Sequence, residues 1–292
     1  MSFGRLITAM VTPFDEQLNI DWDTTAKVID YLIEEQKSDS LVVSGTTGES
    51  PTLSDEEKVE LFRFAVKHAA GRCKIIAGTG SNETAHSVQL TKKAEEAGVD
   101  GILLVAPYYN KPSQEGIYQH FRTIAEATSL PVILYNVPSR TVVSMSADTT
   151  LRLANIPNIV ATKECASLEQ MTEIIAGAPE GFRVYSGDDG VTLPTLAVGG
   201  YGIVSVASHI VGAGMKEMIE AYLEGRVKEA AALNAELFPV FKGLFNCPHP
   251  VPNPVAVKHA LALRGLPVGG VRLPLVPANE AEAKFLQNLL QD

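Results

Sequence analysis

Residues 158–164 read Asn158-Ile159-Val160-Ala161-Thr162-Lys163-Glu164, an apolar, β-branched run that ends in a lysine. Such a run is typical of a buried strand. Lysine is seldom buried, because removal from water disfavours its charged form and lowers its pKa. A neutral amine can attack a ketone or an aldehyde and form a Schiff base. The alternative is a lysine at a strand end that extends its amine to solvent. The residues at the ends of the neighbouring strands distinguish a buried, reactive lysine from a solvent-exposed one.

Similar apolar runs recur along most of the chain and alternate with amphipathic stretches. The runs predicted to be strands are Leu6–Val11, Leu41–Ser44, Lys74–Ala77, Gly101–Ala106, Pro131–Tyr135, Ile159–Lys163, Arg183–Ser186 and Ile203–Ala207. The helices predicted between them include Asp23–Glu35, Glu83–Ala97, Glu115–Thr128 and Leu168–Ala178. A further helix is predicted to begin with a capping box formed by Ser54 and Glu57. We expect left-handed glycines, Gly71, Gly98 and Gly177, to end three of these helices. This alternation indicates a parallel sheet covered by helices.

The number of strand–helix units favours a closed barrel over an open sheet. Eight strands is the number at which side chains just fill a barrel interior. An open doubly wound sheet usually carries a glycine-rich turn after its first strand, but here that strand leads into Thr12-Pro13-Phe14-Asp15. We therefore predict an α/β fold, a (β/α)8 TIM barrel over residues 1–212, followed by a C-terminal helical subdomain over residues 213–292. The helices predicted in that subdomain are Met215–Gly225, Val227–Phe245, Val255–Leu263 and Glu280–Leu290.

The composition excludes several classes of protein. The 292 residues are 46% hydrophobic and 20% charged, as in a globular protein with a large core. A net charge of −10 argues against a nucleic-acid-binding or membrane-surface protein, since both need basic patches. We see neither a signal peptide nor a membrane span. The three cysteines and six histidines follow no metal or redox spacing, so we expect a reduced, cytoplasmic protein without a metal site.

Polar or glycine-rich groups follow the predicted strands, at the end where barrel enzymes carry their active sites. The second strand leads into Gly45-Thr46-Thr47-Gly48-Glu49-Ser50, whose hydroxyls and backbone amides suit an anion such as a carboxylate. The fourth leads into Pro107-Tyr108-Tyr109-Asn110, the fifth into Tyr135–Thr141 and the seventh into Gly187-Asp188-Asp189. These groups would surround one mouth of the barrel together with Lys163.

A Schiff-base reaction needs parts that these segments contain. A hydroxyl must leave the carbinolamine, and the phenols of Tyr135 and Tyr109, linked by Thr46, could relay its proton. The guanidinium fork of Arg140 suits a carboxylate on a second substrate. Each residue alone fits ordinary packing or turn chemistry. Their occurrence together at neighbouring strand ends favours an enzyme that forms a Schiff base through Lys163.

The same segments resemble the dihydrodipicolinate synthase family, within the wider N-acetylneuraminate lyase superfamily, and the resemblance runs essentially from end to end. Its most specific pieces are Gly45–Glu49, Ala106–Pro112, Tyr135–Thr141, Lys163-Glu164 and Ser186–Asp189. The resemblance implies a class I condensation of pyruvate with aspartate 4-semialdehyde to 4-hydroxy-tetrahydrodipicolinate, in the diaminopimelate and lysine pathway. Sugar-acid lyases of the superfamily tend to lack the arginine at 140, whereas the synthases use it for the semialdehyde carboxylate.

The resemblance implies a role for each site residue. Lys163 would form the imine, and the proton relay would be Thr46, Tyr135 and Tyr109, the last supplied by a neighbouring subunit. The residues implied to bind substrate are Thr47 for the pyruvate carboxylate, Arg140 for the semialdehyde carboxylate, and Gly187 and the carbonyl of Val204 as lining. The family implies a homotetramer, a dimer of dimers, and neither metal nor organic cofactor. Cys165 is expected to point away from the Lys163 side of its strand.

Two other functions remain open from the sequence. One is a pyruvate-dependent lyase of keto-deoxy sugar acids or N-acetylneuraminate, and the other is a sensor that binds a ligand without turnover.

The resemblance also gives an expectation about inhibition by lysine. Family members inhibited by lysine bind it with residues that match Ser50, Pro51, Asp55, Lys58, Asn82, His86 and Tyr108. Sensitive members typically carry a histidine or another aromatic residue at the Lys58 position and a glutamate at the His86 position. A cation at Lys58 would repel the amines of bound lysine, so we expect weak or absent inhibition.

Overall fold

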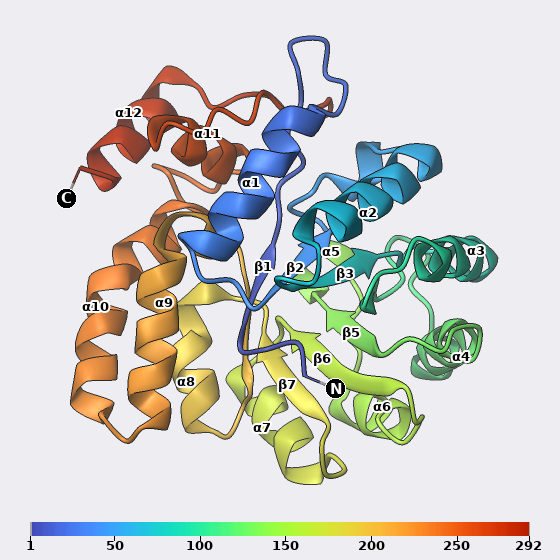
Figure 1. Cartoon of the computed structure of the whole chain (residues 1–292). Helices are drawn as coiled ribbons and strands as arrows, with labels where there is room; N and C mark the ends of the chain where they lie inside the picture. Colours follow the sequence, from blue (N-terminus) through green and yellow to red (C-terminus); the bar gives the residue numbers. More distant parts are fainter. Residues whose placement is uncertain (1, 292) are drawn as a thin grey trace.

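The computed structural model describes residues 2–291 and contains a closed barrel of eight parallel strands in the order β1 to β8 (Figure 1). The strands are β1 (Leu6–Ala9), β2 (Ser40–Val43), β3 (Lys74–Gly78), β4 (Gly101–Val105), β5 (Val132–Asn136), β6 (Ile159–Glu164), β7 (Arg183–Ser186) and β8 (Gly202–Ser205). The predicted barrel and each of its predicted strands are confirmed, with ends that differ by one or two residues.

The strands are mostly apolar because each has two buried faces. Alternate residues of a strand point to opposite sides of the sheet. In β5, Val132 and Leu134 pack outward against the helices, whereas Ile133 and Tyr135 belong to a separate cluster inside the barrel. A buried residue of β6, Ala161, belongs to the inner cluster as well. The same alternation therefore directs Lys163, two residues later, into the barrel interior.

Helices cover the outside of the barrel. Those longer than one or two turns are α1 (Trp22–Glu34), α2 (Asp55–Ala69), α3 (Thr84–Glu96), α4 (Gln114–Ala125), α6 (Ala147–Leu153), α7 (Leu168–Gly177), α9 (Ser208–Leu223), α10 (Val227–Gly243), α11 (Val255–Leu263) and α12 (Glu280–Leu289). Short helical turns are α5 (Pro138–Thr141), α8 (Thr192–Ala197), η1 (Ser50–Thr52) and η2 (Asp189–Val191). The capping box predicted at Ser54 and Glu57 is present at the start of α2.

Two of the three helix-ending glycines were predicted correctly, and one was wrong. Gly71 and Gly98 have positive φ angles of 79° and 85°. Gly177 is instead the last residue of α7, and the chain leaves the helix through an extended Ala178. A residue that precedes proline avoids the helical region, and Ala178 precedes Pro179. Gly177 serves close packing, because a Cβ there would lie 2.7 Å from a methyl carbon of Leu151.

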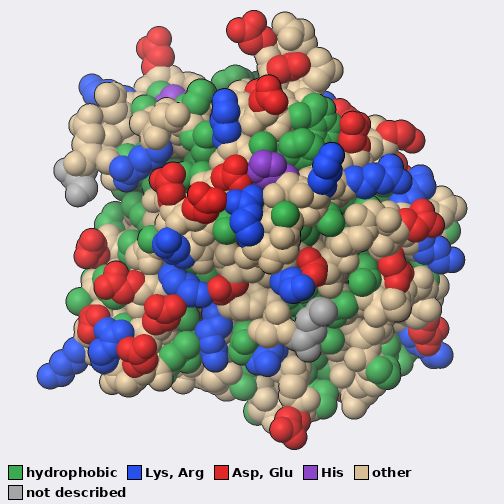
Figure 2. All heavy atoms as spheres, viewed as in Figure 1, with side chains coloured by type: hydrophobic (Ala, Val, Ile, Leu, Met, Phe, Trp, Pro, Cys, Tyr) green, Lys and Arg blue, Asp and Glu red, His purple; other side chains and the backbone are tan. Residues whose placement is uncertain are grey.

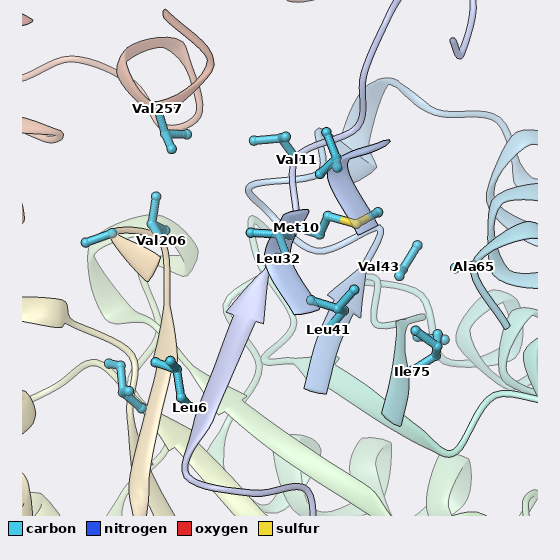
Figure 3. Close-up of a cluster of buried hydrophobic side chains, with 14 of the residues drawn as sticks. Leu6, Met10, Val11, Leu32, Leu41, Val43, Ala65, Ile75, Val206 and Val257 are labelled. Atoms are coloured by element: carbon cyan, nitrogen blue, oxygen red, sulfur yellow. The ribbon is translucent and has the colours of Figure 1, made fainter. Parts of the chain in front are cut away.

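The C-terminal helices pack against one side of the barrel. Helices α9 and α10 lie side by side, and α11 and α12 follow them near α1 (Figure 1). Val257 of α11 points toward Val206, just after β8, and both belong to the large core cluster (Figure 3). Helix α9 crosses the predicted domain boundary at residues 212 and 213, with a non-helical Val211 at its kink. The division of the chain there stays a prediction.

The surface bears acidic and basic side chains intermixed on the face shown in Figure 2. Within residues 2–291, no helix is both long and apolar enough to cross a membrane. The described residues also contain no cluster of three or more histidine, cysteine or acidic side chains suited to a metal ion.

Candidate active site

Lys163 lies inside the barrel on β6, directly beside Tyr135 in the β5–β6 register. Only 6% of its surface is exposed, and its amine lies 4.2 Å from the centroid of the Tyr135 ring. Among the described residues, no carboxylate pairs with this amine and no side chain accepts a hydrogen bond from it. Burial lowers the pKa of Lys163, and the Arg140 guanidinium lowers it further, against opposing contributions from Cys165 and Asp189. The neutral amine needed for a nucleophile is therefore favoured.

A buried polar pair fixes this register on the outer side of the sheet. Asn136 follows Tyr135, Glu164 follows Lys163, and the Asn136 amide donates to Glu164 Oε1 at 2.9 Å. Glu164 also accepts from the backbone N–H of Ala166 at 2.8 Å. Burial raises the pKa of Glu164, and these hydrogen bonds oppose the rise. Because the pair links adjacent strands one residue beyond the site, it keeps the phenol and the amine side by side.

A cavity of about 580 Å³ is lined by Tyr135, whereas its neighbour Lys163 is not one of the lining residues. Thr46, Tyr135 and Arg140 are among its lining residues, so three predicted site residues meet there. Burial raises the pKa of Tyr135, and the nearby Arg140 charge and Thr46 hydroxyl partly offset the rise. The phenol is therefore a neutral donor and acceptor at ordinary pH, as a proton relay needs. Arg140 is exposed and pairs with no carboxylate of the described chain, so its guanidinium is free for a ligand.

The loop after β2 supplies groups suited to an anion. Thr47 is only 2% exposed and does not line the cavity, whereas Thr46 does. Within residues 2–291, the backbone amides of Thr46 and Thr47 donate to no protein acceptor. Adjacent amides without partners are what a bound carboxylate would satisfy. The predicted place of Thr47 as a carboxylate ligand stays a prediction.

The remaining predicted residues lie in different surroundings. Val204 is buried in the inner cluster on β8. Gly187 follows β7, and a Cβ there would lie 2.9 Å from Cε of Lys163, so only glycine leaves the lysine its room. Tyr109 has a positive φ of 73° and is 88% exposed, outside the cavity of its own chain. A single chain thus does not bring Tyr109 to Lys163.

The expectation that Cys165 points away from Lys163 was wrong. Residues two apart on a strand share a face, so Cys165 turns to the same interior as Lys163. A Cβ on Gly187 would lie 2.2 Å from the Cys165 sulfur, and Cys165 packs against the inner cluster. Burial raises the pKa of its thiol to about 11, with Lys163 opposing the rise, so the sulfur is a protonated, weakly nucleophilic neighbour of the amine.

Asp189 is a second residue whose part in the site was not foreseen. It is buried, and its carboxylate accepts from Ser205 Oγ at 2.5 Å and from the backbone N–H of Ala207 at 2.9 Å. Burial raises the pKa of Asp189, and its charge opposes the lowering of the Lys163 pKa. The sequence placed it after the seventh strand, but only the fold shows that it faces β8 rather than solvent.

The cavity extends past the predicted site residues to a cluster of charged side chains. Its far wall includes Asp55, Lys58 and His86. His86 Nε2 lies 2.8 Å from an Asp55 oxygen, and the Lys58 amine lies 3.7 Å from the other. Burial lowers the pKa of Lys58, while Asp55 opposes the change. Asp55 is therefore occupied by two partners of its own chain.

Together these features define a class of protein. A closed parallel barrel with a buried lysine on its sixth strand, next to a tyrosine and a cavity bearing hydroxyl and guanidinium groups, is the arrangement of Schiff-base-forming barrel lyases. The chain belongs to the Dihydrodipicolinate synthetase family, whose sequence profile matches residues 2–292. The resemblance seen in the sequence is thereby confirmed.

Individual relatives agree with the family assignment over the full length. The chain is 58% identical to the 4-hydroxy-tetrahydrodipicolinate synthase of Bacillus velezensis over 293 residues, with 100% of both chains covered. It is 58% identical to the enzyme of the same name from Bacillus subtilis over 294 residues, again with 100% of both covered. The crystal structure of a dihydrodipicolinate synthase from Bacillus anthracis superposes with a TM-score of 0.97 at 54% identity, covering 100% of this chain and 99% of that one.

Proposed function

We propose that this chain is a lyase that condenses pyruvate with aspartate 4-semialdehyde to give 4-hydroxy-tetrahydrodipicolinate, in the diaminopimelate route to lysine. The observation that carries the proposal is the Lys163 amine, buried beside Tyr135 without a carboxylate partner among the described residues. Burial lowers the pKa of this amine and so shifts it toward the neutral form that acts as a nucleophile. Full-length relatives that bear the name of this activity support the choice of substrates.

The reaction follows from ordinary imine chemistry. The Lys163 amine attacks the ketone carbon of pyruvate, and the carbinolamine loses water to give an imine. Loss of a methyl proton gives an enamine, which attacks the aldehyde carbon of the second substrate. The amine of the semialdehyde then adds to the imine carbon, closes the ring and releases Lys163. One water leaves, no electrons are gained or lost, and the protonated imine itself serves as the electron sink.

The other site residues take their places around these steps. Tyr135, Thr46 and Tyr109 carry protons to and from the departing hydroxyl. Thr47 binds the pyruvate carboxylate, and the free guanidinium of Arg140 binds that of the semialdehyde. Gly187 and the carbonyl of Val204 line the site beside the imine carbon. The chemistry needs neither a metal nor an organic cofactor.

We propose further that the active form is a homotetramer in the cytoplasm, built as a dimer of dimers. The exposed phenol of Tyr109 supports this assembly, because it can reach a relay only in another copy of the chain. Tyr109→Phe should then lower turnover while the fold remains, and sedimentation should find an assembly in which the residue is covered. Unchanged turnover of this variant would remove Tyr109 from the relay.

Turnover across a panel of aldehydes, with product followed through a coupled reductase, tests the function. We expect rapid turnover of pyruvate with aspartate semialdehyde, lost in Arg140→Ala. Turnover only with sugar-derived aldehydes would move the chain to the sugar-acid lyases. Borohydride reduction with pyruvate should give a covalent adduct on Lys163. If no adduct forms, the chain is a protein that binds a ligand without forming a Schiff base.

A further inference from the structure

A hydrogen bond joins the C-terminal region to the loop that follows β2. The side-chain amide of Asn253 donates to Thr47 Oγ1 at 2.9 Å, although 206 positions separate the two residues. Both side chains are buried, Asn253 with 8% and Thr47 with 2% of its surface exposed. Asn253 lies in the proline-rich segment 246–254, between Pro252 and Pro254, whose rings restrict the backbone on either side. None of the catalytic steps above uses this contact.

The direction of this hydrogen bond has a chemical consequence. A hydroxyl has one hydrogen to donate and two lone pairs that accept. The Asn253 N–H fills a lone pair of Thr47, and within the described residues Thr47 Oγ1 has no acceptor for its own hydrogen. The hydroxyl therefore remains a donor without a partner, beside the similarly unpartnered amides of Thr46 and Thr47. Three donors in one loop suit one carboxylate.

The loop is also fixed from the C-terminal side at its other end. Glu49 has a positive φ of 56°, a strained conformation for a residue with a side chain. Its carboxylate lies 2.6 Å from the Lys258 amine of α11 and accepts from the backbone N–H of Arg272 at 2.9 Å. Lys258 also donates to the carbonyl of Gly270 at 2.7 Å. The loop thus has two attachments to the C-terminal region, one at Thr47 and one at Glu49.

We propose that Asn253 is a positioning residue, which turns the Thr47 hydroxyl so that its hydrogen points at the carboxylate of pyruvate. The C-terminal segment thereby helps to set the affinity of the barrel for its first substrate. This inference rests on the proposed function, in which Thr47 holds that carboxylate. Asn253 itself touches no reacting atom.

The test compares steady-state constants for Asn253→Ala and Asn253→Asp with those of the unchanged protein. Loss of the fixed hydroxyl should raise KM for pyruvate about tenfold in Asn253→Ala, with KM for the semialdehyde and kcat little changed. Asn253→Asp should raise it more, because a carboxylate only accepts and takes up the Thr47 hydrogen. The control is Asn246→Ala, in the same segment, whose exposed side chain contacts only a carbonyl of Lys242.

Borohydride trapping with two ketones separates positioning from a general loss of structure. Acetone can form an imine with Lys163 but has no carboxylate for Thr47 to bind. In Asn253→Ala the pyruvate concentration for half-maximal trapping should rise about tenfold, while trapping by acetone stays unchanged. Equal losses with both ketones, or a rise in KM as large in Asn246→Ala, would overturn the proposal. If the alanine variant does not fold, Asn253→Asp, nearly the same in size, takes its place in this comparison.

Thr47→Val distinguishes a failure of this inference from a failure of the assigned role of Thr47. We expect Thr47→Val to raise KM for pyruvate and the double variant with Asn253→Ala to raise it no further, since both act through one hydroxyl. Fully additive effects would overturn the Asn253 proposal and leave Thr47 as a ligand. No effect of Thr47→Val on KM would instead overturn the role of Thr47, and the inference with it.

Discussion

Lys163 and Lys258, two of the buried lysines among the described residues, have similar surroundings but differ in their partners. Lys163 in the barrel and Lys258 on α11 are 6% and 3% exposed. Each amine lies over an aromatic ring, 4.2 Å from the centroid of Tyr135 and 4.1 Å from that of Phe14. Lys258, however, is 2.6 Å from a Glu49 oxygen and donates to the carbonyl of Gly270, whereas Lys163 has neither kind of partner among the described residues.

The comparison shows that burial alone does not make a lysine a nucleophile. Burial lowers the pKa of both amines, to about 8 for Lys258. At Lys258 the carboxylate of Glu49 opposes the shift and holds the ammonium in place. At Lys163 neither Cys165 nor Asp189 forms an ion pair with the amine, although both oppose the lowering of its pKa, and the adjacent Tyr135 lines an open cavity. Reactivity therefore requires burial, the absence of a partner and room for a substrate.

The largest expected difference is in covalent chemistry. Lys163→Ala should lower turnover by more than about a thousandfold and abolish the borohydride-trapped pyruvate adduct, because the nucleophile is gone. Lys258→Met should keep the adduct on Lys163. Mass spectrometry of trypsin-digested, reduced protein measures both. An adduct on Lys258, or one that survives in Lys163→Ala, would break the distinction between the two lysines.

Substitution of Lys258 should lower the stability of the fold more than substitution of Lys163, the reverse of the order expected for covalent chemistry. Lys258→Met leaves the Glu49 carboxylate buried without its partner, and we expect the free energy of unfolding to fall by about 3–5 kcal/mol. Lys163→Met removes an amine whose desolvation no ion pair compensates, so stability should be unchanged or higher. Urea unfolding at one protein concentration gives both values, since assembly affects apparent stability. A larger loss in Lys163→Met than in Lys258→Met would contradict this account.

The pH dependence of imine formation sharpens the description of Lys163. Only the neutral amine attacks pyruvate, so the trapping rate rises as pH passes upward through the pKa of the amine. Because burial lowers that pKa from its ordinary 10.5, the midpoint of the rise should lie well below 10.5. Asp189→Asn removes a charge that favours the ammonium, and it should move the midpoint lower still. A midpoint at 10.5, or an upward move in the variant, would contradict the assignment.

The smallest expected effect concerns a third lysine, Lys58, in the far wall of the cavity. Its amine and His86 both engage Asp55, and we expect added lysine to inhibit weakly or not at all. A positive charge at Lys58 repels the amines of the ligand, and Asp55 is already occupied. Steady-state turnover with increasing lysine measures the effect. Half-inhibition below one millimolar lysine would show that the charges of Lys58 and Asp55 do not prevent lysine from binding.

The sequence predicted local features well and the meeting of distant residues poorly. The strands and the capping box at Ser54 follow from short-range patterns, and the structure contains them. The short helices α5, α6 and α8 were missed, because a few residues are too few to display a period. Cys165 was placed on the wrong face, although its spacing of two from Lys163 already carried the correct answer.

The candidate site divides along the same line. Lys163, Thr46, Tyr135 and Arg140 could be named in advance, because each follows a recognisable strand and all strand ends of a parallel barrel meet at one mouth. Asp189 facing β8 and Asn253 bonded to Thr47 could not, because no local pattern reports which side chains meet across 16 or 206 positions. The exposure of Tyr109 likewise required the folded chain.

The sequence by itself determined the eight-stranded barrel and singled out the lysine that we propose carries its chemistry. It did so because the alternation of buried faces and the rarity of buried lysine are properties of neighbouring residues. Only the tertiary structure decided which of the buried lysines is left without a carboxylate. That outcome depends on how α11 packs against the loop after β2. The packing brings the Glu49 carboxylate to Lys258, whereas among the described residues no carboxylate pairs with the Lys163 amine. Pairing is a long-range property, and it separates a structural lysine from a reactive one.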